Sequence, residues 1–476
     1  MARKRVLFAA SEVYPFAKTG GLADVAHSLP RALNGDYAIT VVMPLYRSVD
    51  RDRFGIAPTG EGFEVRMGGE GYPVALYGCS YEGTEYRFVA SPLLSERDYL
   101  YGPPERGYAD NAVRFGIFSH AIVELLRRGD YALAHLNDWQ CGLAALLMHG
   151  DASVAAKSLF TIHNLAYQGV FEAAFLKTLG VGSEHFTMEG IEFYGRLNFM
   201  KAGIGYADRV TTVSPSYVRE ILTPEFGCGL EGYLRHHRGK LSGIVNGIDT
   251  QHFAPENDGA LEEPYRVPSG KTANKNAFLK HSGLKGVKKP LFVFIGRFTW
   301  QKGLDLLIDA LPKIAALECN VAILGEGEAA YHDRLKAVAD AHANVSLEFG
   351  YDERLSHRMY AAADFLLMPS LFEPCGLNQM IAMRYGALPL VHRVGGLADT
   401  VLPVEGYAPA SGDGFGISFN AATERALLGA VQRALELYGD RRRFGAVARH
   451  NMGCDFSWEE RSKAYAALYE QLVQSG

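Results

Sequence analysis

The chain has 476 residues, of which 48% are hydrophobic and 21% are charged, and its formal net charge is −5. This is the composition of a globular protein with enough residues for two hydrophobic cores, and its charge balance argues against a nucleic-acid partner. Its six cysteines include no Cys-x-x-Cys pair, and no apolar run is long enough to span a membrane. We therefore expect a soluble cytoplasmic protein with reduced thiols and without a disulfide framework or a cysteine zinc site.

The first predicted strand, residues 5–10, leads through a loop to a glycine pair, Gly20-Gly21. Apolar residues then recur at helical spacing, so a helix begins at about Gly21. Free backbone N–H groups at a helix start, with Lys18 beside them, suit a phosphate or a sugar oxygen. A tight turn into a surface helix explains the glycines equally well, and the spacing is neither a P-loop nor a dinucleotide fingerprint.

Strands and helices alternate through the rest of the first half, with a few antiparallel strands expected over residues 54–91. Helices are predicted at 112–128 and 142–149, and strands at 39–43, 133–136, 158–162, 209–213 and 241–245. Polar residues repeatedly follow these strands, among them Asn137, Asp138, His163, Asn164 and Asn246. The carboxyl ends of parallel strands line one sheet edge, where ligands bind, although each residue alone is also explained as a turn former or helix cap.

A Pro- and Gly-containing linker is expected at residues 254–274, before a second α/β half. Strands are predicted there at 291–295, 320–324, 345–349, 365–368 and 388–391, and the turn Glu373–Leu377 opens a helix through Tyr385. The tetrapeptide Gly-Leu-Ala-Asp at 21–24 recurs at 396–399. Two similar α/β domains with a cleft between them are therefore predicted, followed by an amphipathic tail at 458–473 that could pack on either domain.

Arg297 and Lys302 lie between a predicted strand end and a helix start. Two cations at this spacing favour a diphosphate, and the carboxylate of Glu373 at another helix start suits sugar hydroxyls. A solvated cationic turn and a helix-capping role for Glu373 are the structural alternatives. No carboxylate-rich Asp-x-Asp pattern suggests a magnesium site and no His/Cys cluster suggests zinc, so no metal site and no cofactor are predicted.

The complete set of motifs resembles the ADP-glucose-dependent glucosyltransferases of family 5, which comprise bacterial glycogen synthases and plant starch synthases. The resemblance covers essentially the whole chain. It rests on Lys18-Thr-Gly-Gly-Leu-Ala-Asp24, Asn137-Asp-Trp-Gln140, Thr161-Ile-His-Asn164, Val245-Asn-Gly-Ile-Asp249, Arg297 with Thr299-Trp-Gln-Lys-Gly303, Glu373-Pro-Cys-Gly-Leu377 and Gly395-Gly-Leu-Ala-Asp-Thr-Val401.

The resemblance implies an α/β GT-B fold, in which two Rossmann-like domains with parallel sheets face a deep interdomain cleft. The implied boundaries are residues 1–250 for the acceptor domain, 251–456 for the nucleotide-sugar domain and 457–476 for a helix that crosses back to the first domain. The implied activity is retaining α-1,4-glucosyl transfer from ADP-glucose to the non-reducing ends of glycogen or another α-glucan, without a metal or cofactor. The oligomeric state is left open, a homo-oligomer included.

Matching the motifs residue by residue assigns roles within that activity. Arg297 and Lys302 would bind the diphosphate, and Glu373 would hold hydroxyls of the donor glucose. His163 and Asn246 would contact that glucose near its 6-hydroxyl, and Asp138 would face the acceptor or the reacting sugar. The remaining substrate-binding residues implied by the resemblance are Lys18, Gly20, Gly21, Asp24, Asn164, Tyr351 (against adenine), Cys375, Gly376, Leu377 and Asn378.

The chain departs from the family pattern at three positions. Asn378 and Val394 stand where the family usually has Thr, and Asn137 stands where bacterial members often have His. The first two departures leave the choice between ADP- and UDP-glucose open, together with a small acceptor in place of a glucan. An α-glucan phosphorylase and a non-catalytic glucan-binding protein are the other classes. The first would need a lysine-linked pyridoxal phosphate, and the second would have no need of leaving-group cations.

Overall fold

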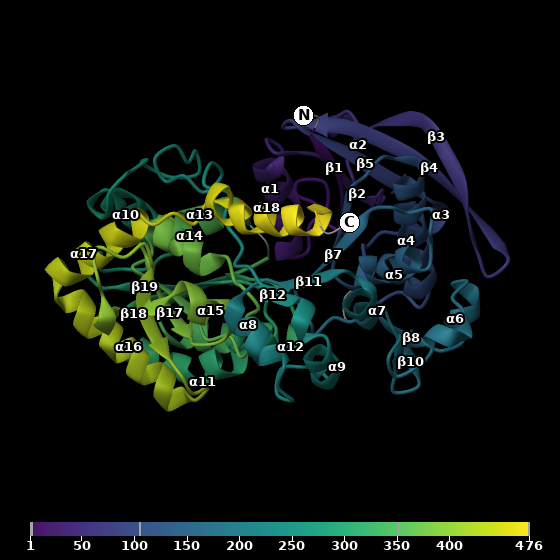
Figure 1. Ribbon diagram of the computed structural model, residues 1–476. Coiled ribbons are helices and arrows are strands. Elements are labelled where there is room, and N and C mark those ends of the chain that lie inside the picture. The colour runs from purple at the N-terminus through teal and green to yellow at the C-terminus, as the bar shows by residue number, and fades with distance from the viewer. Residues whose placement is uncertain (1–2, 104–105, 351, 475–476) are drawn as a thin grey trace. The chain divides into compact units, whose positions relative to one another are not determined.

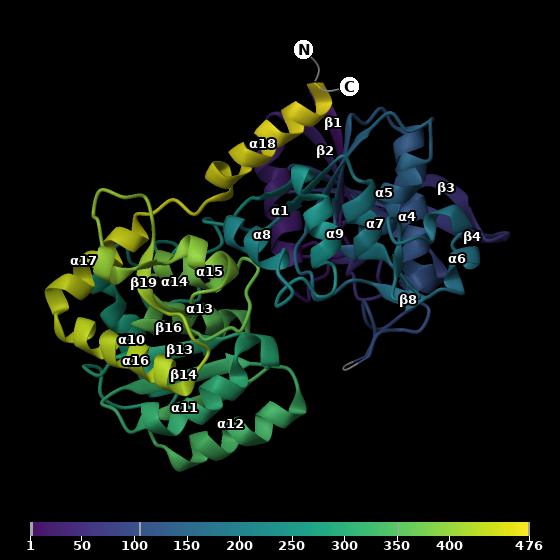
Figure 2. The same ribbon diagram turned by 60° about the horizontal axis from the view of Figure 1, so that its bottom comes forward.

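A computed structural model gives the structure of the protein and describes residues 3–103, 106–350 and 352–474. The chain forms two compact units (Figures 1 and 2). The N-terminal unit comprises residues 1–246 with the C-terminal stretch 461–476, and the C-terminal unit comprises residues 247–460. None of the helices in the described parts of the chain is long and apolar enough to cross a membrane.

The N-terminal unit is built on a nine-stranded sheet with the order β12-β11-β7-β6-β1-β2-β5-β4-β3. The strands from β12 to β5 are parallel, and β4 and β3 continue the sheet antiparallel. The central strands are apolar runs buried on both faces, as expected of a parallel sheet covered by helices. The strands are β1 (Lys4–Ala9), β2 (Tyr37–Pro44), β3 (Ala57–Met67), β4 (Glu70–Tyr81), β5 (Thr84–Ala90), β6 (Leu133–Asn137), β7 (Lys157–Ile162), β11 (Arg209–Thr212) and β12 (Leu241–Gly243).

Helices connect and cover these strands, and a small sheet, β8-β10-β9, lies apart from them. Its strands are β8 (Val170–Glu172), β9 (Glu192–Phe193) and β10 (Arg196–Asn198). The helices of this unit are α1 (Gly21–Leu33), α2 (Arg51–Phe54), α3 (Pro92–Ser95), α4 (Asn111–Arg128), α5 (Trp139–His149), α6 (Phe175–Thr178), α7 (Phe199–Tyr206), α8 (Pro215–Ile221), α9 (Glu231–His236) and the short 3-10 turns η1 (Ser183–His185) and η2 (Arg238–Lys240).

The last helix, α18 (Trp458–Gln474), belongs largely to the N-terminal unit. The Tyr469 hydroxyl lies 2.6 Å from Nδ1 of the buried His135, and the Tyr37 hydroxyl donates to the carbonyl of Ala466 at 3.2 Å. Tyr465, Tyr469 and Leu472 are buried at helical spacing, which explains the amphipathic pattern of the tail.

The C-terminal unit contains a seven-stranded parallel sheet with the order β15-β14-β13-β16-β17-β19-β18. Its strands are β13 (Leu291–Ile295), β14 (Asn320–Gly325), β15 (Val345–Phe349), β16 (Phe365–Met368), β17 (Leu388–His392), β18 (Leu402–Pro403) and β19 (Phe415–Phe419). The connecting helices are α10 (Lys271–His281), α11 (Leu304–Ala315), α12 (Ala329–Ala341), α13 (Glu353–Ala362), α14 (Asn378–Arg384), α15 (Gly395–Thr400), α16 (Glu424–Gly439), α17 (Arg441–Met452) and the 3-10 turns η3 (Pro268–Gly270), η4 (Trp300–Lys302) and η5 (Val404–Gly406).

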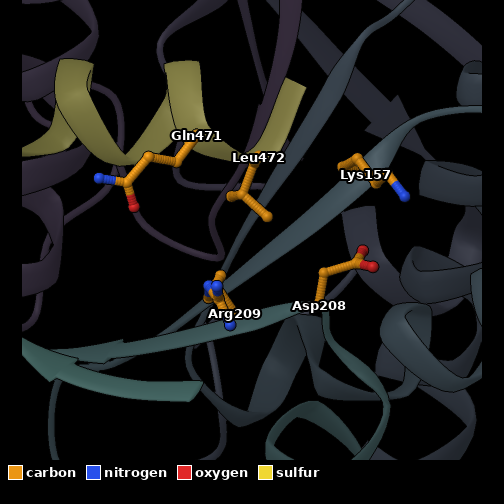
Figure 3. Close-up of a pocket in the computed structure, with 5 residues that line it drawn as sticks. All are labelled: Lys157, Asp208, Arg209, Gln471 and Leu472. Carbon is orange, nitrogen blue, oxygen red and sulfur yellow. The ribbon is translucent and has the colours of Figure 1, made fainter. Parts of the chain in front are cut away.

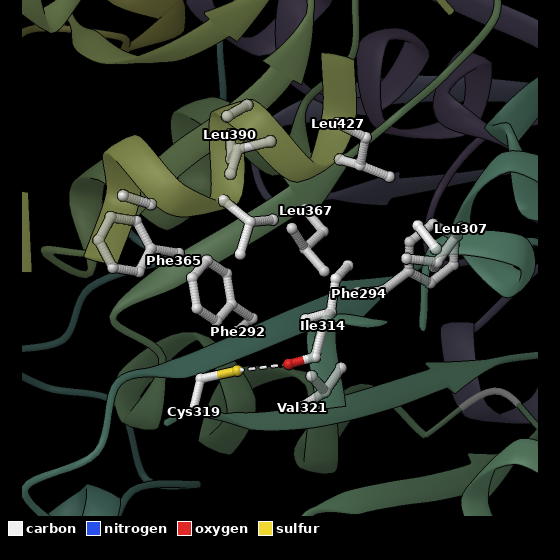
Figure 4. Close-up of a cluster of buried hydrophobic side chains, with 14 of the residues drawn as sticks. Phe292, Phe294, Leu307, Ile314, Cys319, Val321, Phe365, Leu367, Leu390 and Leu427 are labelled. Carbon is white, nitrogen blue, oxygen red and sulfur yellow. Dashed lines mark hydrogen bonds between the residues drawn. The ribbon is translucent and has the colours of Figure 1, made fainter. Parts of the chain in front are cut away.

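One hydrophobic core of this unit lies between the sheet and helices α11 and α16 (Figure 4). Phe292 and Phe365 stack on neighbouring strands with ring centroids 4.9 Å apart. Leu307 from α11 and Leu427 from α16 pack into the same cluster. This packing fixes β13 and β16, whose carboxyl ends carry the predicted diphosphate and sugar residues.

The prediction of two Rossmann-like α/β domains with parallel sheets is confirmed by the two sheets. Several boundaries differ from the sequence-based expectations. The predicted linker at 254–274 was wrong at its end, because η3 and the first turn of α10 occupy residues 268–274. The strand expected at 241–245 ends at Gly243, and the helix expected at 142–149 begins at Trp139.

In each sheet the order in which the chain adds strands reverses near the middle, between β1 and β6 in the first sheet and between β13 and β16 in the second. Chain order runs outward from β1 through β2 to β5 on one side and from β6 through β7 to β11 on the other, and β13 and β16 stand in the same relation in the second sheet. In such doubly wound sheets ligands bind outside the carboxyl ends of the two strands at this switch point. The places to examine are therefore the loops after β1 and β6 and those after β13 and β16.

Candidate active site

The loop between β1 and α1 is held by a buried glutamate, Glu12, which is 4% exposed. Its carboxylate accepts hydrogen bonds from the Thr19 amide at 2.5 Å, the Thr19 hydroxyl at 2.6 Å and the Gly20 amide at 3.2 Å. The Tyr101 hydroxyl donates to the same carboxylate at 2.6 Å. The bonds to this buried carboxylate therefore hold the loop that carries the predicted glycine pair in place. The sequence analysis identified neither Glu12 nor Tyr101.

Lys18 and Asp24, two predicted substrate-binding residues, lie together at the start of α1. The Lys18 ammonium is 2.7 Å from the Asp24 carboxylate, and both side chains are about 30% exposed. The positive charge predicted beside the helix start is therefore paired with a carboxylate of the same helix. At Gly20 the backbone is extended and an added Cβ would meet no atom within 4 Å, so the loop itself does not require glycine there.

Asp138 follows β6 in a strained conformation, with φ 56° and ψ 180°. Residues other than glycine rarely adopt this region, and such strain is concentrated at functional sites. The Asp138 carboxylate accepts the His163 amide at 2.8 Å and also the Asn164 amide. Burial raises the pKa of Asp138 to about 7; these two amides oppose the rise, and the nearby charge of Glu12 adds to it. Asp138, His163 and Asn164 are thus brought together as one cluster.

His163 is buried, and burial lowers its pKa to about 3, so the imidazole is neutral at ordinary pH. Its Nε2 lies 2.9 Å from Oδ1 of Asn137, whose amide nitrogen donates to the Ala9 carbonyl at 2.9 Å. Since Asn137 Oδ1 can only accept, His163 carries its proton on Nε2 and presents Nδ1 as an acceptor. The departure at Asn137 therefore serves to orient His163.

Asn246 is the last residue of the N-terminal unit and is 5% exposed. Its Oδ1 is buried without a hydrogen-bond partner among the described residues. Buried acceptors are nearly always satisfied, so an unpaired one suggests that a ligand completes it. The structure gives no hydrogen bond between Asn246 and His163, so these two residues, predicted to share one sugar, are not joined in the protein alone.

A hollow of about 470 Å³ lies beside this cluster and is lined by Trp139, Tyr167, Gln168, Phe193 and neighbouring residues. Trp139 directly follows Asp138, and Tyr167 comes three residues after Asn164. A Cβ at Gly169 would lie 2.3 Å from the Trp139 ring, and Gly169 has φ +62°, so this position requires glycine. The sequence analysis did not identify this aromatic surface. The aromatic residues close to Asp138 and Asn164 in the sequence could have indicated it.

A second hollow, of about 200 Å³, lies at the opposite end of the strands (Figure 3). Lys157 and Asp208 line it at or just before the starts of β7 and β11, and Gln471 and Leu472 of α18 complete it. The Asp208 carboxylate is already bonded to the Ser158 amide and hydroxyl. Because it lies at the amino ends of the strands, it is not part of the edge that carries Asp138 and His163.

In the C-terminal unit, Lys302 and Glu373 form a close ion pair at the switch point. Lys302 Nζ is 2.6 Å from Glu373 Oε2, and their side chains are 20% and 7% exposed. The Ser370 hydroxyl donates to the same carboxylate oxygen at 3.0 Å. Gly303 follows with φ +69°, and a Cβ there would lie 2.1 Å from the Pro369 carbonyl oxygen. Glycine therefore lets the Lys302 turn approach the loop after β16.

Arg297 lies one residue beyond Gly296, which follows β13 directly. Its side chain is exposed and makes no hydrogen bond or ion pair with any residue that the structure describes. Of the two predicted diphosphate cations, Lys302 is thus fixed by protein and Arg297 is available to a ligand.

The turn Cys375–Leu377 is fixed by its neighbours. Gln379 Nε2 donates to the carbonyls of Cys375 and Gly376, both at 3.0 Å, and to the Thr400 hydroxyl at 3.0 Å. Gly376 has φ +72°, a conformation that favours glycine. The turn before α14 is therefore preorganised by Gln379 and Thr400, residues to which the sequence analysis gave no role.

The structure also accounts for the two other departures. Asn378 Nδ2 donates to the Ile295 carbonyl at 2.7 Å, which ties the start of α14 to the end of β13. Val394 is 6% exposed, and the Gly396 amide after it donates to the Glu373 carbonyl at 3.0 Å. A Cβ at Gly396 would lie 2.3 Å from the Cys375 carbonyl oxygen. The second Gly-Gly corner is therefore a packing contact behind the Glu373 turn.

Tyr351, predicted to face adenine, lies outside the described residues. Among those that are described, a single group of three side chains has a geometry able to hold a metal ion: His252, Glu353 and His357. None of these three belongs to the predicted site, and the sequence showed no such cluster because His252 lies about a hundred residues from the other two.

Comparison with known proteins places these sites in a family. The model of the starch synthase catalytic domain matches residues 5–236, and that of glycosyl transferases group 1 matches residues 276–451. A glycogen synthase of Anaeromyxobacter dehalogenans is 43% identical over 98% of this chain and 99% of its own length. Glycogen synthase 2 of Geobacter sulfurreducens is 40% identical over 99% of each chain.

Among solved structures, the catalytic domain of starch synthase IV from Arabidopsis thaliana, bound to ADP and acarbose, is similar over the full length of both chains, with a TM-score of 0.91 and 32% identity. The sequence relatives and this structure agree in both units. The chain therefore belongs to the glycogen and starch synthase family of glycosyltransferases.

Proposed function

We propose that the protein transfers glucose from ADP-glucose to the 4-hydroxyl at a non-reducing end of glycogen or a related α-glucan, with retention of the α-configuration and release of ADP. The observation that carries the proposal is the Lys302–Glu373 pair at the switch point of the C-terminal unit, together with Arg297, which has no partner among the described residues. A glucan-binding protein has no need of two cations placed to stabilise a leaving group. The ADP named in the Arabidopsis structure supports the same donor class.

The C-terminal unit would stabilise the leaving group. Arg297 would bind the diphosphate through its planar fork and Lys302 through its compact charge. Glu373, positioned by Lys302 and Ser370, would accept hydroxyls of the donor glucose, with the Cys375–Asn378 turn presenting backbone to the sugar and phosphate. Preorganised charges of this kind stabilise the transition state because they need no rearrangement when the leaving group becomes negative.

The N-terminal unit would contact the reacting sugar and the acceptor. Lys18, Gly20, Gly21 and Asp24 would contribute the fixed corner after β1 to donor binding. His163, through the acceptor Nδ1, and Asn246, through its unpaired Oδ1, would bind the glucose near its 6-hydroxyl, with Asn164 and Asp138 beside them.

The acceptor would lie on the aromatic hollow next to Asp138, where the exposed ring of Tyr167 offers a flat face to a sugar and Trp139 lines the floor.

In the reaction, the bond from the anomeric carbon to the phosphate oxygen breaks, and its electron pair leaves with ADP. The acceptor oxygen bonds to the same face of the carbon, and its proton passes to the departing phosphate. Catalysis would then consist mainly of positioning and leaving-group stabilisation. Because every group named comes from one chain, the proposal does not depend on whether the protein forms a homo-oligomer.

The experiment is to measure ADP and UDP release from the matching glucose donors, with and without glycogen, in the presence of EDTA. We expect glycogen-dependent ADP release that EDTA does not reduce. Release of UDP, or turnover only with small acceptors, would instead indicate a nucleotide-sugar glucosyltransferase of different donor or acceptor choice. No release with either donor would overturn the proposal.

A further inference from the structure

Three potential metal ligands meet near the beginning of the C-terminal unit. His252 comes from the segment that enters this unit, and Glu353 and His357 lie one turn apart on α13, so both face the same side of the helix. One ligand atom from each of the three side chains lies within 4.8 Å of the others. His252 Nε2 is 3.0 Å from Glu353 Oε1, and the imidazole centroids of His252 and His357 are 5.0 Å apart.

His357 is the buried member of this group, at 5% exposure. Its Nδ1 lies 2.8 Å from the carboxylate of Asp258, which also accepts the Tyr385 hydroxyl at 2.6 Å. The Ala260 amide donates to the other oxygen of the same carboxylate at 2.8 Å. Asp258 thus accepts hydrogen bonds at both oxygens, and His357 faces it as a donor with the proton on Nδ1.

The other ring nitrogen of His357, Nε2, then carries the lone pair that could bind a metal ion. Nε2 is buried and has no hydrogen-bond partner among the described residues. The arrangement of carboxylate, histidine Nδ1–H and an outward Nε2 lone pair is the one that orients histidine ligands around metal ions. An ion pair between His252 and Glu353 explains those two residues, but it leaves His357 Nε2 unsatisfied.

We infer that His252, Glu353 and His357 bind a divalent transition-metal ion of the Zn²⁺ class, with Asp258 positioning His357. Two imidazole nitrogens and one carboxylate suit Zn²⁺ and its neighbours, and they do not suit Mg²⁺ or Ca²⁺, which prefer sets made of oxygen ligands alone. The ion would tie the segment that enters the C-terminal unit to α13. This role is separate from the proposed glucosyl transfer, to which none of these four residues is assigned.

The test uses the full-length protein after removal of metals, without substrates, so that its result is independent of the transferase activity. Co²⁺ is titrated while its visible d–d absorption is followed, and Zn²⁺ is then added to displace it. We expect one ion per chain, no effect of Mg²⁺, and a higher thermal unfolding midpoint with Zn²⁺. A Cys228→Ser background removes the exposed thiol as an alternative ligand.

The partly exposed ligands provide variants that should fold. His252→Gln and Glu353→Gln should each weaken Co²⁺ binding at least tenfold, and Asp258→Asn should weaken it by about 10- to 100-fold through loss of the positioning contact. His236→Gln with His237→Gln, a neighbouring pair on the N-terminal unit, is the matched control and should bind as tightly as the parent. Absence of the d–d band, or binding that the His252 and Glu353 variants leave unchanged, would overturn the inference.

Discussion

Lys302 and Glu373 show how single residues prepare the proposed donor site. A largely buried ion pair contributes little net stability because both charges lose water, so its retention needs another reason. Here each charge fixes the position of the other, and Ser370 adds a second contact to Glu373. Removal of Lys302 would leave a buried carboxylate without its counter-charge, so its loss affects both folding and chemistry, whereas Arg297 has no partner among the described residues to disturb.

Arg297 therefore gives the cleaner mutational test. Arg297→Ala should lower kcat/KM for ADP-glucose by about 100- to 1,000-fold, the effect of removing one preorganised charge contact worth about 2.7–4 kcal/mol. Its thermal unfolding midpoint should match that of the parent. Arg442→Ala, which removes an exposed arginine on α17, is the control and should be fully active. Near-normal turnover of the Arg297 variant would remove Arg297 from the diphosphate site.

Lys302→Ala should lower kcat/KM by a similar factor but should also destabilise the C-terminal unit, because Glu373 is left buried and unpaired. In Lys302→Ala/Glu373→Gln the carboxylate charge is gone, so stability should return while activity stays low. Calorimetry of both variants separates the two effects. Recovery of activity in the double variant would contradict a direct role for Lys302.

The raised pKa of Asp138 predicts a pH-dependent stability. Between about pH 4 and pH 7 the folded state keeps a proton that the unfolded state has lost, so stability falls as pH rises through this range and is constant above it. Asp138→Asn should remove this dependence, making the variant more stable than the parent at pH 8 by about 1–2 kcal/mol, with allowance for partial exposure of the side chain. At the same pH its turnover should be much lower.

Denaturant unfolding of parent and variant from pH 4 to pH 8 measures the effect. Asn164→Ala serves as a control, because it removes a neighbouring polar side chain while the Asp138 titration remains. Equal pH slopes for the parent and the Asp138 variant would show that Asp138 is not the titrating group.

At the scale of elements, hydrogen bonds between strand ends and helix starts explain the effect of a residue that departs from the family pattern, Asn378. The Asn378 side chain bonds to the β13 carbonyl at Ile295. Loss of this tie should cost about 1 kcal/mol of stability, the usual net value of one hydrogen bond. It should leave the donor choice unchanged, because the amide nitrogen already has a protein partner.

Asn378→Thr, which restores the residue usual in the family, tests this directly. The ratio of turnover with ADP-glucose to turnover with UDP-glucose should change by less than about threefold, a difference well under 1 kcal/mol. Asn378→Ala is the companion variant, which should lose the same stability and keep the same ratio. A reversal of donor preference in either variant would place Asn378 in the sugar-nucleotide site.

The elements also show what the sequence could and could not predict. Strands such as β6 and β16 are short apolar runs buried on both faces, so their periodicity and length identify them directly. The first turn of helix α10 fell within the linker predicted at 254–274, which was inferred from its prolines, a glycine and several acids. In the structure Lys275 is buried against Asp364 at 2.5 Å, and Lys271 donates to the Tyr360 carbonyl at 3.0 Å. Burial lowers the pKa of Lys271 to about 7, an environment that no local pattern reveals.

The site residues divide in the same way. Polar residues just after strands could be predicted because the carboxyl ends of parallel strands meet at one edge, which gave Asp138, His163 and Arg297. Glu12 and Gln379 support these residues from behind through contacts with backbone amides and carbonyls. The His252 group depends on a contact between segments about a hundred residues apart. These supporting contacts form only when distant segments pack together, so the spacing of sequence motifs cannot predict them.

At the scale of the whole molecule, the chain ends by returning to its first sheet. The two units have cores of their own, but residues 461–476 complete the N-terminal unit. Tyr469 of α18 bonds to His135 of the central strand β6 and packs edge-on against Tyr37 of β2, with ring centroids 5.3 Å apart. The stability of the N-terminal unit should therefore depend on a helix that follows the whole C-terminal unit in the sequence.

Tyr469→Phe isolates this dependence, because it removes only the hydroxyl and leaves Nδ1 of buried His135 without its partner, while Nε2 keeps Thr161. We expect a loss of about 1–3 kcal/mol, the cost of one buried unsatisfied group, which lowers the unfolding midpoint of the N-terminal unit by about 2–12 °C. Amide hydrogen exchange should speed up in β1, β2 and β6 and stay unchanged in β13 and β16, since those strands belong to the other core. Tyr194→Phe, at a side chain 80% exposed, should change neither quantity. Equal exchange in both units of the Tyr469 variant would mean that α18 stabilises the chain as a single cooperative unit, because two independent cores cannot share the loss of one contact.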